Sequence, residues 1–439
     1  MPKCTEERID FGRLGRRIIE ADFSGGELSS DGGLMLLRQV DRRTGLTRAA
    51  AAALSDPRDA SKVVHSLHSL IAQRIYALCC GYEDLNDHDR LREDVLLQTA
   101  LGRAQTLASS PTLCRLETGA TRAHGAGLHE VLVSQFIASQ RKAPKRLVLD
   151  IDASDIPLHG SQELREFHGY YDHHCYLPLY VFCADAMLAC YLRRSRIDGA
   201  KNATALLKVL VQRLRRSWPG VEIIVRADSG FCRPRLMRWC ERNGVGYVLG
   251  IARNVRLQAI VALAELALAD RYATSTIKQR EIGEFTYAAD SWDKERRVIT
   301  RLEYSALGTN PRFIVTNLNT EATALYDTFY CQRGEAENRI KEAQLDLFGT
   351  RASCHKFLAN QFRLLLAALA YTLMQQLRML ALQSSELANA CAATVRVRLL
   401  KIGVAIVRNT RRVRLMFASH HPLRELFAAA AARLSAQSP

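Results

Sequence analysis

The sequence predicts an α/β protein built on a mixed β-sheet with flanking helices, a β-rich insertion and a helical N-terminal region. Strand-like apolar runs alternate with helical patterns between residues 147 and 252. Up to about residue 145 the apolar residues instead recur at helical spacing. The chain has 439 residues, 48% of them hydrophobic, which is enough for two or three domains with substantial cores.

The central sheet is predicted to begin with a strand over about 147–152. Two apolar runs follow it, "YLPLYVFCAD" and "MLACYLRRS", and they are close enough to form an antiparallel hairpin. The remaining elements are a helix over 202–218 with an Asn cap, a strand over 221–228, a helix ending at Gly244 and a strand over 245–252. The order β-β-β-α-β-α-β implies a partly parallel sheet, because crossover helices join parallel strands. This order is the core of the RNase H-like fold.

The first strand, in "LVLDIDASDIPLHG", carries acids that a buried strand rarely tolerates, because an unpaired buried carboxylate is costly. In an extended strand Asp150 and Asp152 share one face, and the leucines and isoleucine share the other. The two acids are therefore presented together from one side of the sheet. Asp155 follows the strand, where "SDIP" stops regular pairing, and is predicted to turn the chain.

Two further acids are predicted to approach the same place. Asp228 ends the strand "VEIIVRAD" before a Ser-Gly turn, at the carboxyl edge where ligands of open α/β sheets gather. Glu337 belongs to a helix predicted over 325–348. One side of this helix carries Tyr330, Arg333, Glu337, Lys341 and Gln344. An apolar stripe lies about 90° away at 100° per residue, so the helix buries that stripe and turns Glu337 toward the edge acids.

The charge of the chain indicates a polyanionic partner. Lys and Arg outnumber Asp and Glu by 61 to 45, for a net charge of +16, and the basic residues are spread along the whole length. Such a field favours nucleic acid. Residues 395–418 hold seven basic residues and no acid, and their period-two stretch predicts a basic ribbon or surface hairpin, with a merely solvated basic face as the alternative.

Cysteine usage and the chain start favour a reducing, cytoplasmic location. The twelve cysteines include no C-x-x-C pair, so neither a zinc ribbon nor a disulfide framework is predicted. The N-terminal residues show no signal-peptide pattern. The most apolar helix candidate starts at Phe362 and is interrupted by Gln375, Gln376 and Arg378, which is typical of a core helix rather than a membrane span.

The residues around the three acids resemble bacterial insertion-sequence DDE transposases. The relevant signature is Tyr, two residues, Arg, three residues, Glu, six residues, Lys. Here it reads Tyr330, Arg333 and Glu337, with Gln344 in place of the lysine, and Lys341 is the candidate to supply the missing charge. "DAS" from Asp152 and "RADSGF" match the segments around the other acids, and "FSGGELSSDGGLMLLRQVDRRTGL" and "FHGYYDHHCYLPLYVF" extend the similarity over nearly the whole chain.

This resemblance implies a polynucleotidyl transferase. Asp152, Asp228 and Glu337 would be the catalytic residues and would hold two Mg²⁺ ions, with Mn²⁺ as a substitute, because hard divalent cations take oxygen ligands and can flank a scissile phosphate. Water would attack at a transposon end to free a 3′-hydroxyl, which then attacks target DNA. The DNA phosphates would be contacted by Tyr330, Arg333, Lys341 and Gln344.

The resemblance also gives an expected organisation. The expected parts are a helical N-terminal DNA-binding region (1–145), the first part of the catalytic core (146–252), a mostly β insertion (253–322), the completion of the core with the Glu-bearing helix (323–385) and a basic C-terminal region (386–439). The partners would be terminal inverted repeats and target DNA, and two ends imply a homodimer on DNA. The location would be the bacterial cytoplasm, associated with the nucleoid, and no membrane is expected.

Several alternatives stay open at this stage. Asp150 could replace Asp152 as the first ligand, although Ser154 after Asp152 favours the latter. Trp292 is a candidate for base stacking or a partly buried structural residue. The run starting at His173 is better suited to packing and DNA contacts than to zinc. Helices within 60–80 and 83–101 are candidates for the unit that reads the inverted repeats.

Two rival functions fit the same acids. The first is another RNase H-like nuclease, such as a junction resolvase, which cuts branched DNA without joining a 3′-hydroxyl to a target. The second is a retired transposase that acts only as a DNA-binding protein, and Gln344 keeps this alternative open.

Overall fold

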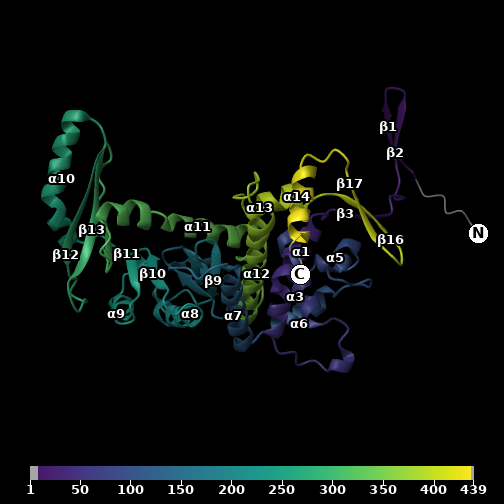
Figure 1. Cartoon of the computed structure of the whole chain (residues 1–439), viewed down its shortest axis with the longest axis horizontal. Helices are drawn as coiled ribbons and strands as arrows, with labels where there is room; N and C mark the ends of the chain where they lie inside the picture. The colour runs from purple at the N-terminus through teal and green to yellow at the C-terminus, as the bar shows by residue number, and fades with distance from the viewer. Residues whose placement is uncertain (1–7, 437–439) are drawn as a thin grey trace, which may run out of the picture. The chain divides into compact units, whose positions relative to one another are not determined.

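The computed structural model describes residues 8–436, and the chain divides into two compact units (Figure 1). One unit takes the residues up to 116 and those from 373 onward. The other takes residues 117–372 and contains the central sheet.

The sheet of the second unit has nine strands within the described residues, in the order β12-β13-β15-β11-β10-β4-β8-β9, with β14 beside β13. Its central strands are β4 (Arg146–Ala153), β8 (Leu179–Cys183), β9 (Ala186–Tyr191), β10 (Glu222–Ala227) and β11 (Gly246–Ile251). Strand β10 is parallel to β4 and β11, whereas β8 is antiparallel to β4 and β9. The predicted mixed sheet and its order of elements are thus confirmed.

Two helices connect strands of the sheet as predicted, α8 (Ala203–Ser217) between β9 and β10 and α9 (Pro234–Arg242) between β10 and β11, and helix α7 (Arg122–Ser139) precedes β4. Their apolar residues pack with the leucine face of β4, where Leu149 and Ile151 are almost fully buried. Asn202 occupies the N-cap position of α8 in the left-handed conformation (φ 69°), but its side chain makes no capping hydrogen bond.

A small three-stranded sheet between β4 and β8 was not anticipated. It is formed by β5 (Ile156–Pro157), β6 (Glu166–His168) and β7 (His173–Tyr176). Asp155 lies directly before β5, at the exit turn predicted for it.

The predicted insertion extends the central sheet. It comprises α10 (Val255–Ser275), β12 (Gln279–Tyr287), β13 (Arg296–Ser305), β14 (Gly308–Thr309) and β15 (Arg312–Thr316). Strand β15 pairs antiparallel with β11, so the β-rich segment covers what would otherwise be an open edge of β11. Covering an edge satisfies its backbone groups and prevents pairing with another chain.

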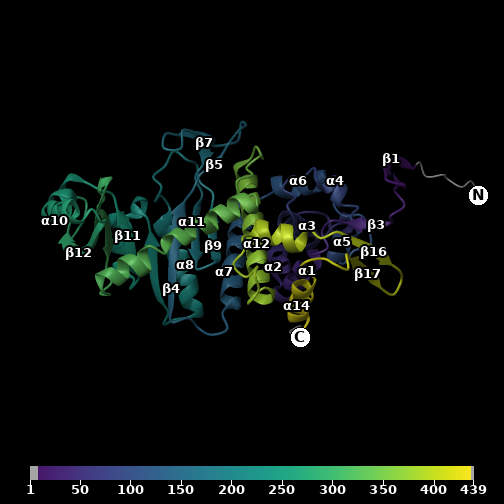
Figure 2. The same ribbon diagram turned by 90° about the horizontal axis from the view of Figure 1, so that it is seen from above.

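The single helix predicted over 325–348 is divided into three segments. They are the π-helical η3 (Ala324–Tyr330), α11 (Arg333–Lys341) and the π-helical η4 (Glu342–Asp346). The apolar stripe is buried as predicted, including Ala336, Ile340 and Leu347. Figure 2 shows α11 crossing the sheet, and α11 contacts β4. The long helix α12 (Phe357–Ala381) follows.

One helix of the described residues, α12, is long and apolar enough to cross a membrane by length and composition. Its most apolar window is 83% buried inside the protein. The prediction of a core helix therefore agrees with its environment.

The other unit combines helices with two small sheets. Its elements are β1 (Ile9–Leu14), β2 (Arg17–Ala21), β3 (Glu27–Ser29), α1 (Leu34–Thr44), α2 (Leu46–Ala52), η1 (Ala60–Lys62), α3 (Leu67–Cys80), α4 (His88–Leu91), α5 (Val95–Ala100), α6 (Ser110–Thr118), α13 (Ala392–Val395), η5 (Arg396–Leu400), β16 (Val404–Arg408), β17 (Val413–Phe417) and α14 (Arg424–Ser435). The prediction of a wholly helical N-terminal region was wrong for residues 9–29, where β1 and β2 pair with each other and β3 pairs with the distant β16.

The structure shows two features of this unit that the sequence predictions concerned, the basic C-terminal stretch and the helix α3. The basic C-terminal stretch does form a hairpin, β16–β17, preceded by the helical turn η5. Helix α3, within the region proposed to read DNA, is buried from Ser69 to Cys80. A helix buried on all sides presents no side chains to a DNA groove, so α3 is unsuited to reading bases.

Candidate active site

Two of the predicted acids end neighbouring parallel strands. The register of β4 and β10 pairs Ile151 with Ala227, so the next residues along the two strands, Asp152 and Asp228, lie side by side at the carboxyl edge of this strand pair. Asp152 Oδ1 accepts a hydrogen bond from the Ala153 N–H at 2.8 Å. Asp228 Oδ1 accepts one from the Gly230 N–H at 2.9 Å, at the start of the turn η2 (Ser229–Phe231). These local bonds orient both carboxylates.

Arg333 connects the third acid to the first. Its Nη1 lies 2.7 Å from Glu337 Oε1, one helical turn along α11, and 3.8 Å from Asp152 Oδ2. The side chain of Glu337 is 42% exposed, whereas that of Asp152 is 20% exposed. The structure therefore brings the three acids and Arg333 to one edge of the sheet, with the site open on the side of Glu337.

The negative charges of this cluster outweigh its positive charge. Burial, the largest cause, and the carboxylates of Asp228 and Glu337 together raise the pKa of Asp152 to about 7, against the opposing effects of Arg333 and the Ala153 N–H. Carboxylates that repel one another in this way are stabilised by an additional cation.

Tyr330 and Gly250 lie directly beside the Asp228 turn. Burial is the main cause of the raised pKa of the Tyr330 phenol. A Cβ atom added at Gly250 would be 2.7 Å from Tyr330 Oη and 2.8 Å from the Ser229 nitrogen. Gly250 thus permits the close approach of β11, the Asp228 turn and η3. Gly250 was not among the predicted site residues, although a glycine inside a strand pattern is a known sign of close backbone approach.

Asp150, the alternative first ligand, is part of a closed ion pair. Its two oxygens accept hydrogen bonds from Arg226 Nε at 2.5 Å and Nη2 at 2.8 Å, and both side chains are less than 10% exposed. Arg226 also donates to the Phe329 carbonyl oxygen and stacks on the Phe329 ring. The pair therefore ties β4 and β10 to η3, the segment that leads into α11. An arginine within the apolar strand "VEIIVRAD" was the sequence signal for such a partner.

Gln344 lies inside the protein. It accepts a hydrogen bond from the Ser154 hydroxyl at 3.3 Å and donates to the Asp155 carbonyl at 3.1 Å and to Tyr180 Oη at 3.3 Å. It is only 7% exposed, which contradicts the predicted phosphate contact, because a buried amide with these bonds does not reach solvent. Lys341, by contrast, is exposed at the end of α11.

Trp292 and His173 both have partners within the fold. The Trp292 ring packs edge to face against Tyr287 at 5.6 Å, and the Arg296 guanidinium lies 5.5 Å from its centroid. Trp292 is half-buried against the core, which favours the structural alternative over base stacking. His173 Nε2 lies 2.7 Å from Asp155 Oδ2, so this pair joins β7 to the exit turn of β4.

The described residues include no group of three or more His, Cys, Asp or Glu side chains arranged to hold one metal ion. Arg333 occupies the position between Asp152 and Glu337 instead. The hard oxygen donors and their mutual repulsion nevertheless fit a divalent cation such as Mg²⁺.

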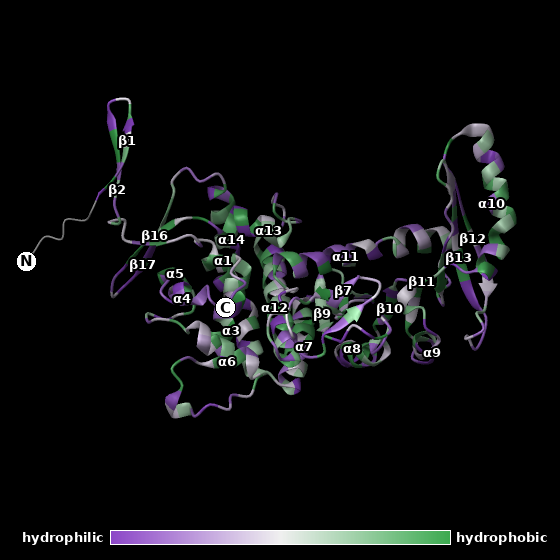
Figure 3. Cartoon of the chain, turned by 180° about the vertical axis from the view of Figure 1, so that it is seen from behind, coloured by the Kyte–Doolittle hydropathy of each residue, from purple (hydrophilic) through white to green (hydrophobic). Residues whose placement is uncertain are grey.

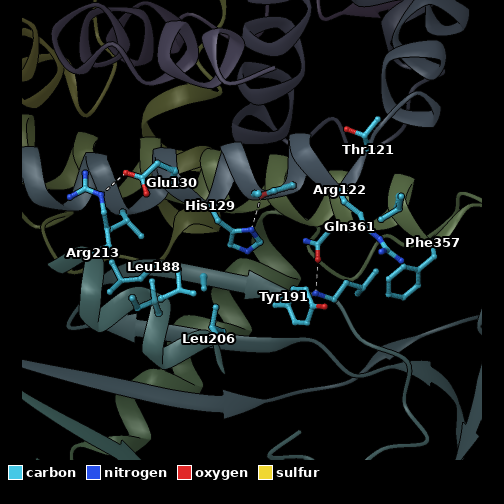
Figure 4. A pocket seen from close by; sticks show the side chains of 18 of the residues that line it. Thr121, Arg122, His129, Glu130, Leu188, Tyr191, Leu206, Arg213, Phe357 and Gln361 are labelled. Carbon is cyan, nitrogen blue, oxygen red and sulfur yellow. Dashed lines mark hydrogen bonds and ion pairs between the residues drawn. The ribbon is translucent and has the colours of Figure 1, made fainter. Parts of the chain in front are cut away.

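A cavity of about 790 Å³ lies away from the acids, along the outer side of β9 (Figure 4). Apolar side chains such as Leu188, Leu206 and Phe357 line much of it. His129 accepts from the Cys190 N–H, and Gln361 bonds to Cys190 and Leu192, so side chains cap the free edge of β9. Arg122 and Arg213 also reach this cavity, but most of its lining is apolar.

The central sheet, with β10 parallel to β4 and β11 and β8 antiparallel to β4, has the RNase H-like order of elements that the sequence predicts. The family model "Transposase DDE domain group 1" matches residues 11–439, and the chain belongs to that family. It is therefore a DDE transposase by family. No protein with a curated description matches the chain. Among solved structures, a piggyBac transposase synaptic complex with hairpin DNA is similar over 85% of this chain and 80% of that chain, at 10% identity and a TM-score of 0.42.

Proposed function

We propose that this protein cuts DNA at the ends of an insertion sequence and joins the freed 3′-hydroxyl to target DNA. The observation that carries the proposal is the convergence of Asp152, Asp228 and Glu337 around Arg333 at the carboxyl edge of the sheet. In the first step water forms a bond to phosphorus and the 3′-oxygen leaves. In the second step that 3′-oxygen forms a bond to a target phosphorus and the target 3′-oxygen leaves.

We propose Asp152, Asp228 and Glu337 as the residues that hold two Mg²⁺ ions, with Mn²⁺ as a substitute. The bound metal would supply positive charge next to the scissile phosphate. Asp152 is proposed over Asp150 because both Asp150 oxygens are engaged by Arg226.

The surrounding residues are proposed to position DNA and the acids. The guanidinium of Arg333 is proposed to shift from the carboxylates to a DNA phosphate, because an arginine forms strong hydrogen bonds to both kinds of anion. Lys341 and Tyr330 are proposed as further phosphate contacts. The Asp150–Arg226 pair, through the Phe329 carbonyl, would fix the segment that leads into the Glu337 helix.

The basic hairpin β16–β17 is proposed to hold DNA phosphates. Its turn and second strand expose Arg411, Arg412 and Arg414. Such contacts add affinity without sequence preference and weaken with salt. The working form is proposed to be a homodimer on two transposon ends, acting at the nucleoid in the bacterial cytoplasm.

The test uses the inverted repeats expected to flank the gene. The full chain is incubated with labelled repeat-end DNA, a target plasmid and Mg²⁺, and the expected products are nicked ends and end–target joints. Asp152→Asn, Asp228→Asn and Glu337→Gln should each abolish both products while DNA binding persists. Cleavage without joints would instead indicate a nuclease, and binding without cleavage would indicate a DNA-binding protein.

A further inference from the structure

The cavity beside β9 has the size of a ligand-binding site. Four elements of one unit line it, namely α7, α8, β9 and the start of α12, and Figure 3 shows hydrophobic residues on each of them. Its volume of about 790 Å³ lies in the range of small-molecule sites, roughly 300–1,000 Å³. Packing voids in protein interiors are far smaller, because side chains interdigitate closely. The cavity is therefore a candidate site for a small molecule.

The apolar lining is left partly uncovered by the described residues. Val209 of α8 is 64% exposed, Leu164 is 50% exposed and Tyr191 is 41% exposed. Leu206 and Leu210, on the same helix as Val209, continue this apolar surface into the cavity. A contiguous exposed apolar surface is typical of a binding site. We therefore expect the main part of the ligand to be apolar.

Side chains already occupy the free edge of β9. The Cys190 N–H donates to His129 Nε2 at 3.3 Å. The Gln361 amide donates to the Cys190 carbonyl oxygen at 3.0 Å and accepts from the Leu192 N–H at 2.7 Å. A peptide strand that adds to a sheet needs these backbone groups. Strand addition is thus blocked at residues 190–192, and the ligand has to bind through side chains.

Two hydrogen-bond donors of the lining have no acceptor. Neither the Arg122 guanidinium nor the Tyr191 hydroxyl has a hydrogen-bond partner within the described part of the chain. Figure 4 shows both side chains toward the end of the cavity where Phe357 lies. This end of the cavity can therefore donate to an anionic group.

The other charged side chains of the lining are engaged. Glu163 Oε2 accepts the backbone N–H of Phe357 at 2.9 Å, at the start of α12. Glu130 pairs with Arg213 at 2.6 Å. Among residues 8–436, Arg122 is thus the one charged side chain of the lining that lacks a partner.

We propose that the cavity binds a single-chain carboxylate, with its head group on Arg122 and Tyr191 and its hydrocarbon chain along α7 and α8. A carboxylate accepts two parallel hydrogen bonds from a guanidinium and can accept another from a phenol. One unpaired cation matches a head group with one negative charge. This favours a carboxylate over a phosphate monoester, which carries nearly two charges at neutral pH.

The length of the cavity indicates the length of the hydrocarbon chain. Arg122 and Val133 both line the cavity and are 11 residues apart on α7, which corresponds to about 16 Å at 1.5 Å per residue. At roughly 1.2 Å per bond of an extended chain, this distance accommodates about 12 to 14 carbon atoms. Dodecanoate is therefore a suitable probe.

Isothermal titration calorimetry of the full chain without DNA tests the site with dodecanoate, its shorter homologue octanoate and the cation dodecyltrimethylammonium. Dodecanoate should bind with a Kd in the micromolar range. Octanoate should bind at least tenfold more weakly, because each buried methylene strengthens binding by up to about fourfold. The cation has the same chain but should also bind at least tenfold more weakly, because its head group cannot accept hydrogen bonds from Arg122.

Variants test the apolar wall and the head-group end separately. Val209→Glu should weaken dodecanoate binding at least tenfold, because it places a charge in the apolar wall. The matched control Val255→Glu, at an 81% exposed valine of α10, should not change it. Arg122→Glu should weaken dodecanoate binding about tenfold and strengthen binding of the cation, whereas Arg48→Glu, at an exposed arginine of α2, should change neither. Circular dichroism and thermal melting should show that each variant is folded.

Three results would overturn the proposal. They are no dodecanoate binding up to about 100 µM, equal affinities for octanoate and dodecanoate, and dodecanoate binding that is indifferent to Val209→Glu or Arg122→Glu. The site lies away from the edge acids and the measurements contain no DNA. Their failure therefore leaves the proposed cutting and joining of DNA unaffected, and failure of the cleavage assay leaves this site unaffected.

Discussion

Strand β4 carries two carboxylate clusters, a closed one within the sheet and an open one at its edge. In the closed cluster Asp150 is matched by one guanidinium, which satisfies both its oxygens. In the open cluster three acids share Arg333, and Asp152 is left with a pKa of about 7. The two acids are separated by one residue on the same face, so the identity of the side chain does not decide its role. The balance of nearby charge and exposure decides it.

The largest expected difference between the clusters is in activity. Asp152→Asn should reduce strand cleavage by roughly 10³-fold, about 4 kcal/mol of transition-state stabilisation, because it removes an oxygen donor from the proposed metal site. Asp150→Asn should keep activity per folded molecule within about tenfold. Gel assays of end cleavage measure both, and the opposite ranking would reverse the assignment of the first ligand.

The next largest difference is in stability. Asp150→Asn leaves a buried guanidinium without its carboxylate, and removal of one partner of a buried pair costs about 3–5 kcal/mol. Asp228→Asn, at the open edge, should change the free energy of unfolding by less than about 1 kcal/mol. Urea denaturation followed by tryptophan fluorescence gives both values. The double variant Asp150→Leu/Arg226→Met should recover most of the loss; equal losses in single and double variants would argue against the closed pair.

The dependence of stability on pH should separate the clusters further. The folded-state pKa of Asp152, about 7, lies above its usual value of 3.8, so the folded protein binds more protons between these values. This contribution to stability is complete below about pH 4 and is lost as pH rises through 7. In the presence of a metal chelator, the free energy of unfolding of the Asp152→Asn variant should therefore rise by roughly 2 kcal/mol relative to that of the wild type between pH 5 and pH 7. Thermal melting across this range provides the measurement, and a difference that is independent of pH would contradict the raised pKa.

The smallest expected effects distinguish Gln344 from Lys341. Gln344→Ala removes buried hydrogen bonds to Ser154, Asp155 and Tyr180 and should cost about 1–2 kcal/mol of stability. Lys341→Ala should leave stability within about 0.5 kcal/mol and weaken end-DNA binding, with a shallower dependence on salt. Fluorescence anisotropy at several salt concentrations tests the second part. A stability loss for Lys341→Ala without a change in DNA binding would contradict its proposed phosphate contact.

The sequence by itself determined the mixed sheet, the order of its strands and crossover helices, and the presence of acids at strand ends. These features depend on apolar periodicity and turn residues, which are local along the chain. The family resemblance, carried by short segments around Asp228 and Glu337, was confirmed by the family match over residues 11–439. The roles of the individual site residues stay proposals.

Only the tertiary structure decided which side chains meet. Asp150 and Arg226 are 76 residues apart, and Ser154 and Gln344 are 190 apart, so no local pattern predicts either contact. The structure likewise turned residues 9–29 into strands and joined the insertion to β11, because a strand needs a partner that the sequence does not specify. Burial and pairing are properties of the assembled fold, and they are what separate Asp150 from Asp152.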